Sequence, residues 1–312
     1  MSETPKNGIH TEYYLNDQKK SEGNYKNGKL DGKHTSWYWT DQKETEANYK
    51  NGKRDGKCTE WHDNGQMSFK GNYKNGKLDG ENTSWYKNGQ IQGEANFKNG
   101  KLDGKQKMWH ENGQKFFEGT SKDGKSEGKS TMWYENGQKQ KEGKFKDGNE
   151  DGKQTKWFEN GQKELEGKTI NGKAEGRATV WYESGQIQAD LYYKDGKLDG
   201  KKTKWFENGQ KELEGKTING KAEGKVTAWY ESGQKQKEAN YKDGKEDGKW
   251  TQWHKNGQMS FEGNYKNGKL VGEETFWYVS GRKVNPEEDK MSVDAQKRVD
   301  AQKRIQNDKR NK

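Results

Sequence analysis

One aromatic residue recurs every 24 residues along most of this chain, and that fixed period constrains the fold more than any other feature. Tryptophan occupies this slot from Trp37 to Trp277 without insertion or deletion, and Tyr13 takes the slot one period earlier. Such a period means that each copy is one small structural unit stacked on its neighbours. The sequence therefore predicts about twelve repeats, with any function lying along a surface rather than in one pocket.

Two recurring turn signals divide each repeat into two strands. Counted from the Trp slot as position 0, glycine recurs at positions 4, 15 and 19, as at Gly65, Gly76 and Gly80. The first two glycines usually follow Asn or Asp, and an Asn-Gly pair between alternating runs is a strong hairpin signal because both residues tolerate positive φ. Each repeat is therefore expected to form one β-hairpin.

The side chains along these strands alternate with period two, which is not a helical pattern. Thr59 and Trp61 share one face of the first strand. On the second strand the even positions, from Met67 through Phe69 to Tyr73, are mostly apolar or aromatic, and the odd positions are polar. The pattern predicts a buried Trp row. Because one repeat buries too little surface to offset its chain entropy, the copies must stack to fold.

Composition limits the class of protein. The chain is 24% hydrophobic and 35% charged, which would indicate disorder if the period were absent. A net charge of +10 suits a polyanion partner, but lysine and acidic residues alternate within each repeat, which favours a mixed, solvated surface. Cys58 is the only cysteine, and neither a signal segment nor a membrane-spanning apolar run is present. We expect a cytoplasmic protein without a membrane span.

The residues that usually carry chemistry form no catalytic constellation. Three of the five histidines, His62, His110 and His254, lie at position 1, at least 48 residues apart, which excludes a compact metal cluster in a linear stack. Asn-Gly-Lys without a following helix is not a phosphate loop. Acidic residues recur in every copy, so no pair of carboxylates stands out. We therefore expect no enzyme activity, no cofactor and no metal site.

Position 1 holds the candidate binding residues, because it is always aromatic or histidine and strand parity places it opposite the Trp row. A row of rings could bind peptide, sugar or single-stranded nucleic acid by stacking, or the rings could pack on one another and on lysine stems. This candidate face comprises Tyr38, His62, Tyr86, His110, Tyr134, Phe158, Tyr182, Phe206, Tyr230, His254 and Tyr278.

Lysine at positions 13, 16 and 20 forms further rows, for example Lys74 and Lys77. Rows at hairpin spacing could follow a phosphate backbone. The Glu near position 9 and the acid at position 18 oppose this, so nucleic acid is disfavoured as a partner.

The segment Glu262–Gly272 combines an acid-Gly pair, an aromatic residue, Asn-Gly, and another Gly four residues later. This pattern resembles the MORN repeat and recurs through residues 11–281. It is most similar to the bacterial variant, in which Trp-Tyr-x-Asn-Gly-Gln alternates with Tyr-Lys-Asn-Gly-Lys. The resemblance implies an elongated single-layer antiparallel sheet of hairpins and no enzyme activity, since members serve as scaffolds, membrane-associated platforms or oligomerisation modules. Members of the bacterial variant are often labelled as antitoxins of toxin–antitoxin pairs.

The end of the chain differs from the repeats. Asn285 and Pro286, followed by two Glu residues, form a helix-start signal, and a thin apolar stripe runs from Met291 to Ile305. We expect a short helix over part of residues 285–312 that caps the last strand, mediates self-association or a partner contact, or frays as a basic tail. Residues 1–10 form a leader, and residues 11–284 form the repeat array.

Three hypotheses about function follow. The first is a non-catalytic scaffold that binds another protein, such as a cognate toxin, through a face of the sheet. The second is a structural or surface-attached spacer whose array length is the function. The third, association with a polyanion or a membrane surface, rests on net charge alone.

Overall fold

The computed structural model describes residues 7–285, and every regular element within them is a β-strand, as the alternation predicts. The chain divides into two compact units between Gly185 and Gln186. The first strand begins at Asn7, so it includes four residues that the sequence analysis assigned to a leader. The helix expected within residues 285–312 lies outside the described residues, apart from Asn285, which is in no regular element.

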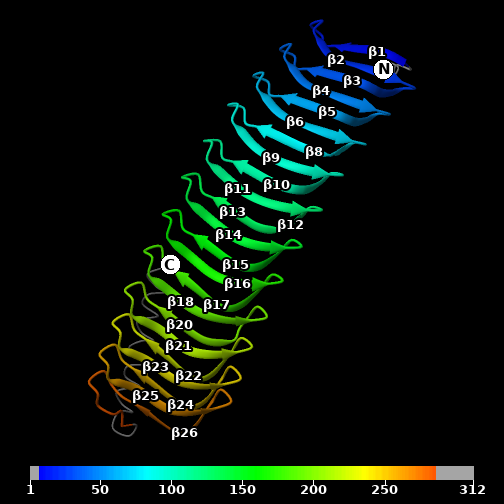
Figure 1. Cartoon of the computed structure of the whole chain (residues 1–312). Coiled ribbons are helices and arrows are strands. Elements are labelled where there is room, and N and C mark those ends of the chain that lie inside the picture. Colours follow the sequence, from blue (N-terminus) through cyan, green and yellow to red (C-terminus); the bar gives the residue numbers. More distant parts are fainter. Residues whose placement is uncertain (1–6, 286–312) are drawn as a thin grey trace, which may run out of the picture. The chain divides into compact units, whose positions relative to one another are not determined.

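The first unit is a succession of antiparallel hairpins (Figure 1). Each long strand pairs with the next along the chain, and the short β7 and β12 continue into β8 and β13 after one residue, whose backbone N–H still donates to the neighbouring strand. Its strands are β1 (Asn7–Tyr13), β2 (Lys19–Lys26), β3 (Lys29–Trp37), β4 (Lys43–Lys50), β5 (Lys53–Trp61), β6 (Met67–Lys74), β7 (Lys77–Leu78), β8 (Gly80–Trp85), β9 (Ile91–Lys98), β10 (Lys101–Trp109), β11 (Lys115–Lys122), β12 (Lys125–Ser126), β13 (Gly128–Trp133), β14 (Lys139–Lys146), β15 (Asn149–Trp157), β16 (Lys163–Ile170) and β17 (Lys173–Trp181).

The second unit repeats the same plan. Its strands are β18 (Ile187–Lys194), β19 (Lys197–Leu198), β20 (Gly200–Trp205), β21 (Lys211–Ile218), β22 (Lys221–Trp229), β23 (Lys235–Lys242), β24 (Lys245–Trp253), β25 (Met259–Lys266) and β26 (Lys269–Phe276). A single bridge between Trp277 and Lys283 follows β26.

A β-bulge in each copy changes which side chains share a face. Glu60 pairs with Phe69, but the next residue, Trp61, pairs with Met67, so Ser68 is left over in β6. Paired residues point to the same side of a sheet, and a bulge inserts one unpaired residue. Met67 therefore lies on the side of Trp61, and Phe69 lies on the opposite side. The predicted single face from Met67 to Tyr73 is wrong at its first residue.

The two sides of the sheet differ in chemistry. We call the side with Trp at position 0 and Thr at position −2 the Trp face, and the side with positions 8, 10, 12 and −3 the Tyr face. The most buried apolar side chains, Ala47, Cys58 and Ala239, lie on the Tyr face and are at most 2% exposed. The Trp side chains are only half-buried. The predicted buried Trp row is therefore only partly buried, because the single layer in each unit leaves its rings partly open.

Both rows of turns are tied from copy to copy. Asn64 at position 3 donates its amide N–H to the carbonyl of Lys87 in the next copy at 2.7 Å. On the opposite edge, the Asp55 carboxylate at position 18 accepts the backbone N–H of Asn75 in the next turn at 2.9 Å. Asn75 and Gly76 hold φ values of 52° and 81°, as an Asn-Gly hairpin requires. These links explain why the turn residues recur so strictly.

Candidate functional site

The predicted position 1 residues form links between successive copies. The Tyr38 hydroxyl donates to the carbonyl oxygen of Trp61 at 2.8 Å, and His62 Nε2 donates to the carbonyl of Trp85 at 2.9 Å. The same contact, at 2.7–3.0 Å, is made by Tyr14, Tyr86, His110, Tyr134, Tyr230 and His254. The donor group of the position 1 ring therefore forms a hydrogen bond with the backbone carbonyl of the Trp in the next copy.

All eleven predicted rings are half-buried, and each stands at its own turn rather than in a shared cluster. Phe158 and Phe206 occupy the slot without a hydrogen-bond donor. The Arg282 guanidinium lies 4.8 Å from the centre of the Tyr278 ring. Binding of a partner by this row stays a prediction, while its structural role is visible in the hydrogen bonds.

On the Trp face, seven of the rings lie next to the lysine at position 6 of the preceding copy. Lys139 Nζ lies 5.5 Å from the centre of the Trp157 ring, a distance suited to cation–π attraction. The same arrangement joins Lys19 to Trp37, Lys43 to Trp61, Lys115 to Trp133, Lys163 to Trp181, Lys211 to Trp229 and Lys235 to Trp253. In other copies an apolar residue, such as Met67 or Ile91, takes position 6.

The glutamate at position 9 connects two lysines on this face. Glu142 accepts from Lys139 at 2.7 Å and lies 3.1 Å from Lys129 on the neighbouring strand. The Lys139 hydrogen bond holds the pKa of the Glu142 carboxyl below its ordinary value of 4.5, partial burial acts in the opposite direction, and Lys129 adds to the lowering. Glu46, Glu166, Glu214 and Glu238 stand in equivalent pairs. Each of these glutamates thus pairs with two lysines and balances one of their two positive charges.

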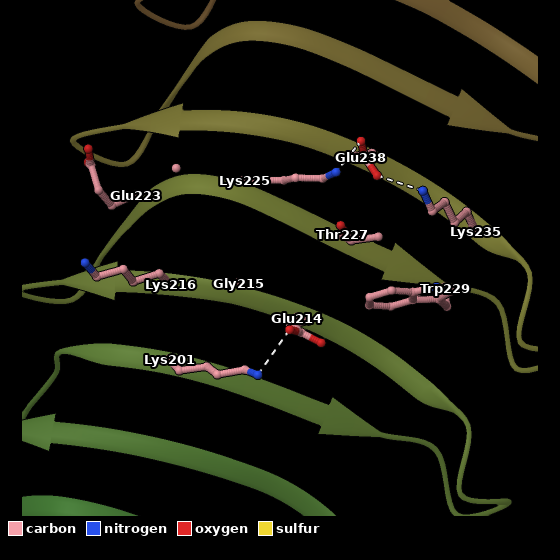
Figure 2. Close-up of a pocket in the computed structure, with 11 residues that line it drawn as sticks. Lys201, Glu214, Gly215, Lys216, Glu223, Lys225, Thr227, Trp229, Lys235 and Glu238 are labelled. Carbon is pink, nitrogen blue, oxygen red and sulfur yellow. Dashed lines mark hydrogen bonds and ion pairs between the residues drawn. The ribbon is translucent and has the colours of Figure 1, made fainter.

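Between these ion pairs the Trp face is hollowed into shallow grooves. One groove, in the second unit, has a volume of about 830 Å³, with Thr227 and Trp229 of β22 between Lys201–Glu214 and Lys225–Glu238 (Figure 2). A groove of about 380 Å³ in the first unit uses the same repeat positions, including Thr131 and Trp133. A third, of about 350 Å³, includes Thr83 and Glu94. The groove is thus a feature of the repeat itself.

The larger groove lies at a hairpin with an altered pairing, which also occurs between Lys168 and Glu175 in the first unit. Most copies carry Asn at position 11. There, Asn48 lies close to Gly56 on the next strand: a Cβ added at Gly56 would lie 3.3 Å from the Cβ of Asn48. In the second unit, Lys216 takes this position and pairs directly with Glu223, and nothing lies within 4 Å of a Cβ added at Gly224. The longer, charged pair leaves the sheet surface at this point uncovered.

Groups for other chemistry are sparse. Within residues 7–285, no group of three or more His, Cys, Asp or Glu side chains is placed to hold a metal ion. Burial raises the pKa of the Cys58 thiol to about 11, so the thiol stays protonated at neutral pH. The part of the chain that the structure describes includes no helix that is long and apolar enough to span a membrane.

The groove residues were not among the residues predicted from sequence. Thr at position −2, Glu at position 9 and Lys at position −4 recur in most copies, so the signal was present. These polar residues alternate along the strands as a solvated surface would. The bulge that brings position 6 to the Trp face has no signature in a polar sequence.

The fold and the repeating face define a β-hairpin repeat protein. The family model described as "MORN repeat variant" matches residues 6–27, 54–75, 78–99, 102–123, 126–147, 174–195, 222–243 and 246–267. These segments cover more than half of the chain, so the chain belongs to the MORN repeat variant family.

Comparison with other proteins adds little to this assignment. No curated protein matches the sequence significantly. Among solved structures, the chain is similar to "Crystal Structure of TcdB2-TccC3-Cdc42" at 10% identity and a TM-score of 0.18, over 87% of this chain and 16% of that one. "Crystal Structure of TcdB2-TccC3" gives 11% identity, a TM-score of 0.18, and coverage of 88% and 16%. The chain thus spans less than a fifth of the length of these proteins.

Proposed function

We propose that this protein is a non-catalytic scaffold that binds another protein through its Trp face. The observation that carries the proposal is the groove that recurs at the same repeat positions in both units. Each groove combines an aromatic ring, a threonine and charges of both signs, which together suit a polar protein surface. A repeated groove lets a partner engage several copies at once, so weak individual contacts can add up.

The charge pairs distinguish this face from a polyanion site. Lys129 and Lys225 each lie within 3.1 Å of a glutamate, so neither presents an isolated positive charge. Binding here is therefore expected to depend only weakly on salt, whereas phosphate recognition is strongly salt-dependent. The resemblance to the bacterial variant makes a cognate toxin the first partner class to test.

The experiment compares two neutral double variants in the same region. Lys129→Ala with Glu142→Ala removes an ion pair of the Trp face, and Lys141→Ala with Glu150→Ala removes a 2.6 Å pair of the Tyr face. The full chain is used to capture partners from its native host, and each captured protein is then purified and titrated. We expect the first variant to weaken binding by about tenfold or more, and the second by about twofold at most.

The matching pair in the second unit, Lys225→Ala with Glu238→Ala, repeats the test at the larger groove. Equal losses from the Trp-face and Tyr-face variants would contradict the assignment of the face.

A second function is favoured by the links between copies. Positions 1, 3 and 18 join one copy to the next where they carry a donor or acceptor, as at Tyr134, Asn136 and Asp151. Such a pattern suits a spacer whose length is its function. The spacer is supported if no purified protein binds and removal of copies changes only the distance that the chain bridges.

A further inference from the structure

One edge of the first unit carries lysines that, unlike those of the Trp face, have no acidic partner. Positions 13 and 16 flank the Asn-Gly or Asp-Gly turn and pair directly across it. Five successive copies place two lysines there: Lys26 with Lys29, Lys50 with Lys53, Lys74 with Lys77, Lys98 with Lys101, and Lys122 with Lys125. We call these ten side chains the lysine edge. All ten are exposed, and within the described residues no ion pair is found on any of them.

Like charges directly opposite each other destabilise an antiparallel pair. The hairpin does not need them, because other copies build the same turn with Lys146 opposite Asn149, or Ile170 opposite Lys173. The turn itself therefore does not require the five consecutive like-charged pairs, nor the three further pairs in the second unit, Lys194–Lys197, Lys242–Lys245 and Lys266–Lys269.

The nearest acids on this edge are already engaged. The carboxylates of Asp31, Asp55 and Asp79 accept the backbone N–H groups of the following turns at 2.9–3.1 Å. They contribute one negative charge for two lysines in each copy, and one oxygen of each is used by the turn. A net positive charge thus remains on the edge in the first four copies, whereas in the fifth copy Asp123 of the turn and Glu127 balance Lys122 and Lys125.

The stems of the position 16 lysines are laid along the edge. An added Cβ at Gly52 would lie 3.6 Å from Lys29 Cβ, and at Gly100 it would lie 3.4 Å from Lys77 Cβ. Each lysine therefore extends beside the glycine of the next turn rather than away from the sheet. Successive pairs are two strands apart, or about 10 Å at ~4.8 Å per strand, so the edge presents a regular row of ammonium groups over about 40 Å.

We propose that the lysine edge binds a linear, base-free polyanion of the polyphosphate type. A flexible chain can follow a straight row and meet every lysine pair. A DNA duplex brings a given strand back to the same side only once per ~34–36 Å, so its phosphates would meet few of the lysine pairs. The rings nearest the edge, such as Tyr49 and Tyr73 at position 12, are half-buried on the Tyr face. The edge thus lacks the stacking platform on which single-stranded nucleic acid relies.

The test titrates the full chain with fluorescent long-chain polyphosphate at about 50 and 200 mM salt. The edge variant replaces Lys50, Lys53, Lys74, Lys77, Lys98 and Lys101 with Gln. The control variant replaces six lysines of the Trp face in the same unit, namely Lys33, Lys43, Lys115, Lys129, Lys139 and Lys153, so that it loses the same charge. Circular dichroism checks that both variants are folded, and a Lys→Arg version of the edge variant should retain binding.

If about five lysines are engaged, unmodified protein should lose affinity on the order of 100-fold between the two salt concentrations. The edge variant should bind at least about tenfold more weakly at low salt and show a shallower salt dependence, while the control keeps most of the affinity. Equal losses in both variants would overturn the proposal, because net charge alone would then explain binding. Tighter binding of single-stranded DNA or of anionic vesicles at equal phosphate concentration would overturn the choice of ligand.

Discussion

At the scale of single residues, position 1 of the repeat shows what one hydroxyl group contributes to stability. Tyr134 donates to the carbonyl of Trp157 at 2.9 Å, whereas Phe158, one copy later, has no donor to offer. We expect Tyr134→Phe to destabilise its region by about 1 kcal/mol and Phe158→Tyr to stabilise its region by a similar amount. Hydrogen exchange of the neighbouring strand amides measures both. Changes of the same sign in the two variants would show that the hydroxyl is not the cause.

The glutamates of the Trp face predict a dependence on pH. The Lys139 hydrogen bond, and then the Lys129 contact, hold the pKa of Glu142 below its ordinary value of 4.5, and equivalent pairs lower the pKa of Glu46 and Glu166. Because the folded pKa is the lower one, the unfolded chain binds protons more readily. The stabilisation is therefore complete above about pH 4.5 and is lost as the pH falls through the folded pKa.

We expect the denaturation midpoint to fall as the pH drops below about 4.5. Because these ion pairs are partly exposed to solvent, each contributes little to the free energy of unfolding, and the pH dependence should be measurable only as the sum over several copies. Urea titrations between about pH 3 and pH 7 measure it. A variant with Gln at positions 46, 142 and 166 should have a flatter profile, and a profile as steep as that of the unmodified protein would contradict this origin.

At the scale of elements, the turns were predictable from sequence and the faces were not. Asn-Gly at Asn75 and Gly76 demands positive φ, a local requirement that one dipeptide satisfies, so the hairpins follow from the residues alone. The sides of Met67 and Phe69 depend on a bulge at Ser68, which nothing in a polar alternating run announces. For the same reason the grooves of the Trp face could not be predicted, although their residues recur visibly.

The links between turns and strands also make a prediction at this scale. The Asp79 carboxylate accepts the backbone N–H of Asn99 at 3.0 Å and so ties one hairpin to the strand of the preceding copy. Asp79→Ala should weaken this turn by about 1 kcal/mol and raise amide exchange at Asn99 by about fivefold. Asp79→Glu is the control, because Glu127 makes the same contact to Asp147 at 3.1 Å. Equal exchange in the Ala and Glu variants would show that the carboxylate contributes nothing.

At the scale of the whole molecule, stability is a sum of neighbouring contacts. Within each unit the long strands pair with their neighbours in sequence, so a copy can be removed if its two neighbours can rejoin. Deleting residues 61–84 joins Glu60 to Trp85, which restores the register at the junction. We expect a folded, shorter chain that keeps its β circular dichroism and a cooperative transition, with a denaturant m-value lower in proportion to the lost surface.

Deleting residues 61–72 is the matched half-period control within the same copy. This deletion joins Glu60 to Tyr73 and removes the turn at position 4, so two strand segments that belong side by side become one continuous run. A shift of this kind places side chains on the wrong faces and leaves a gap in the pairing. We expect the half-period variant to lose cooperative unfolding while the full-period variant keeps it. Equal damage from both deletions would mean that the copies are not independent stacking units, and the nearest-neighbour description would fail.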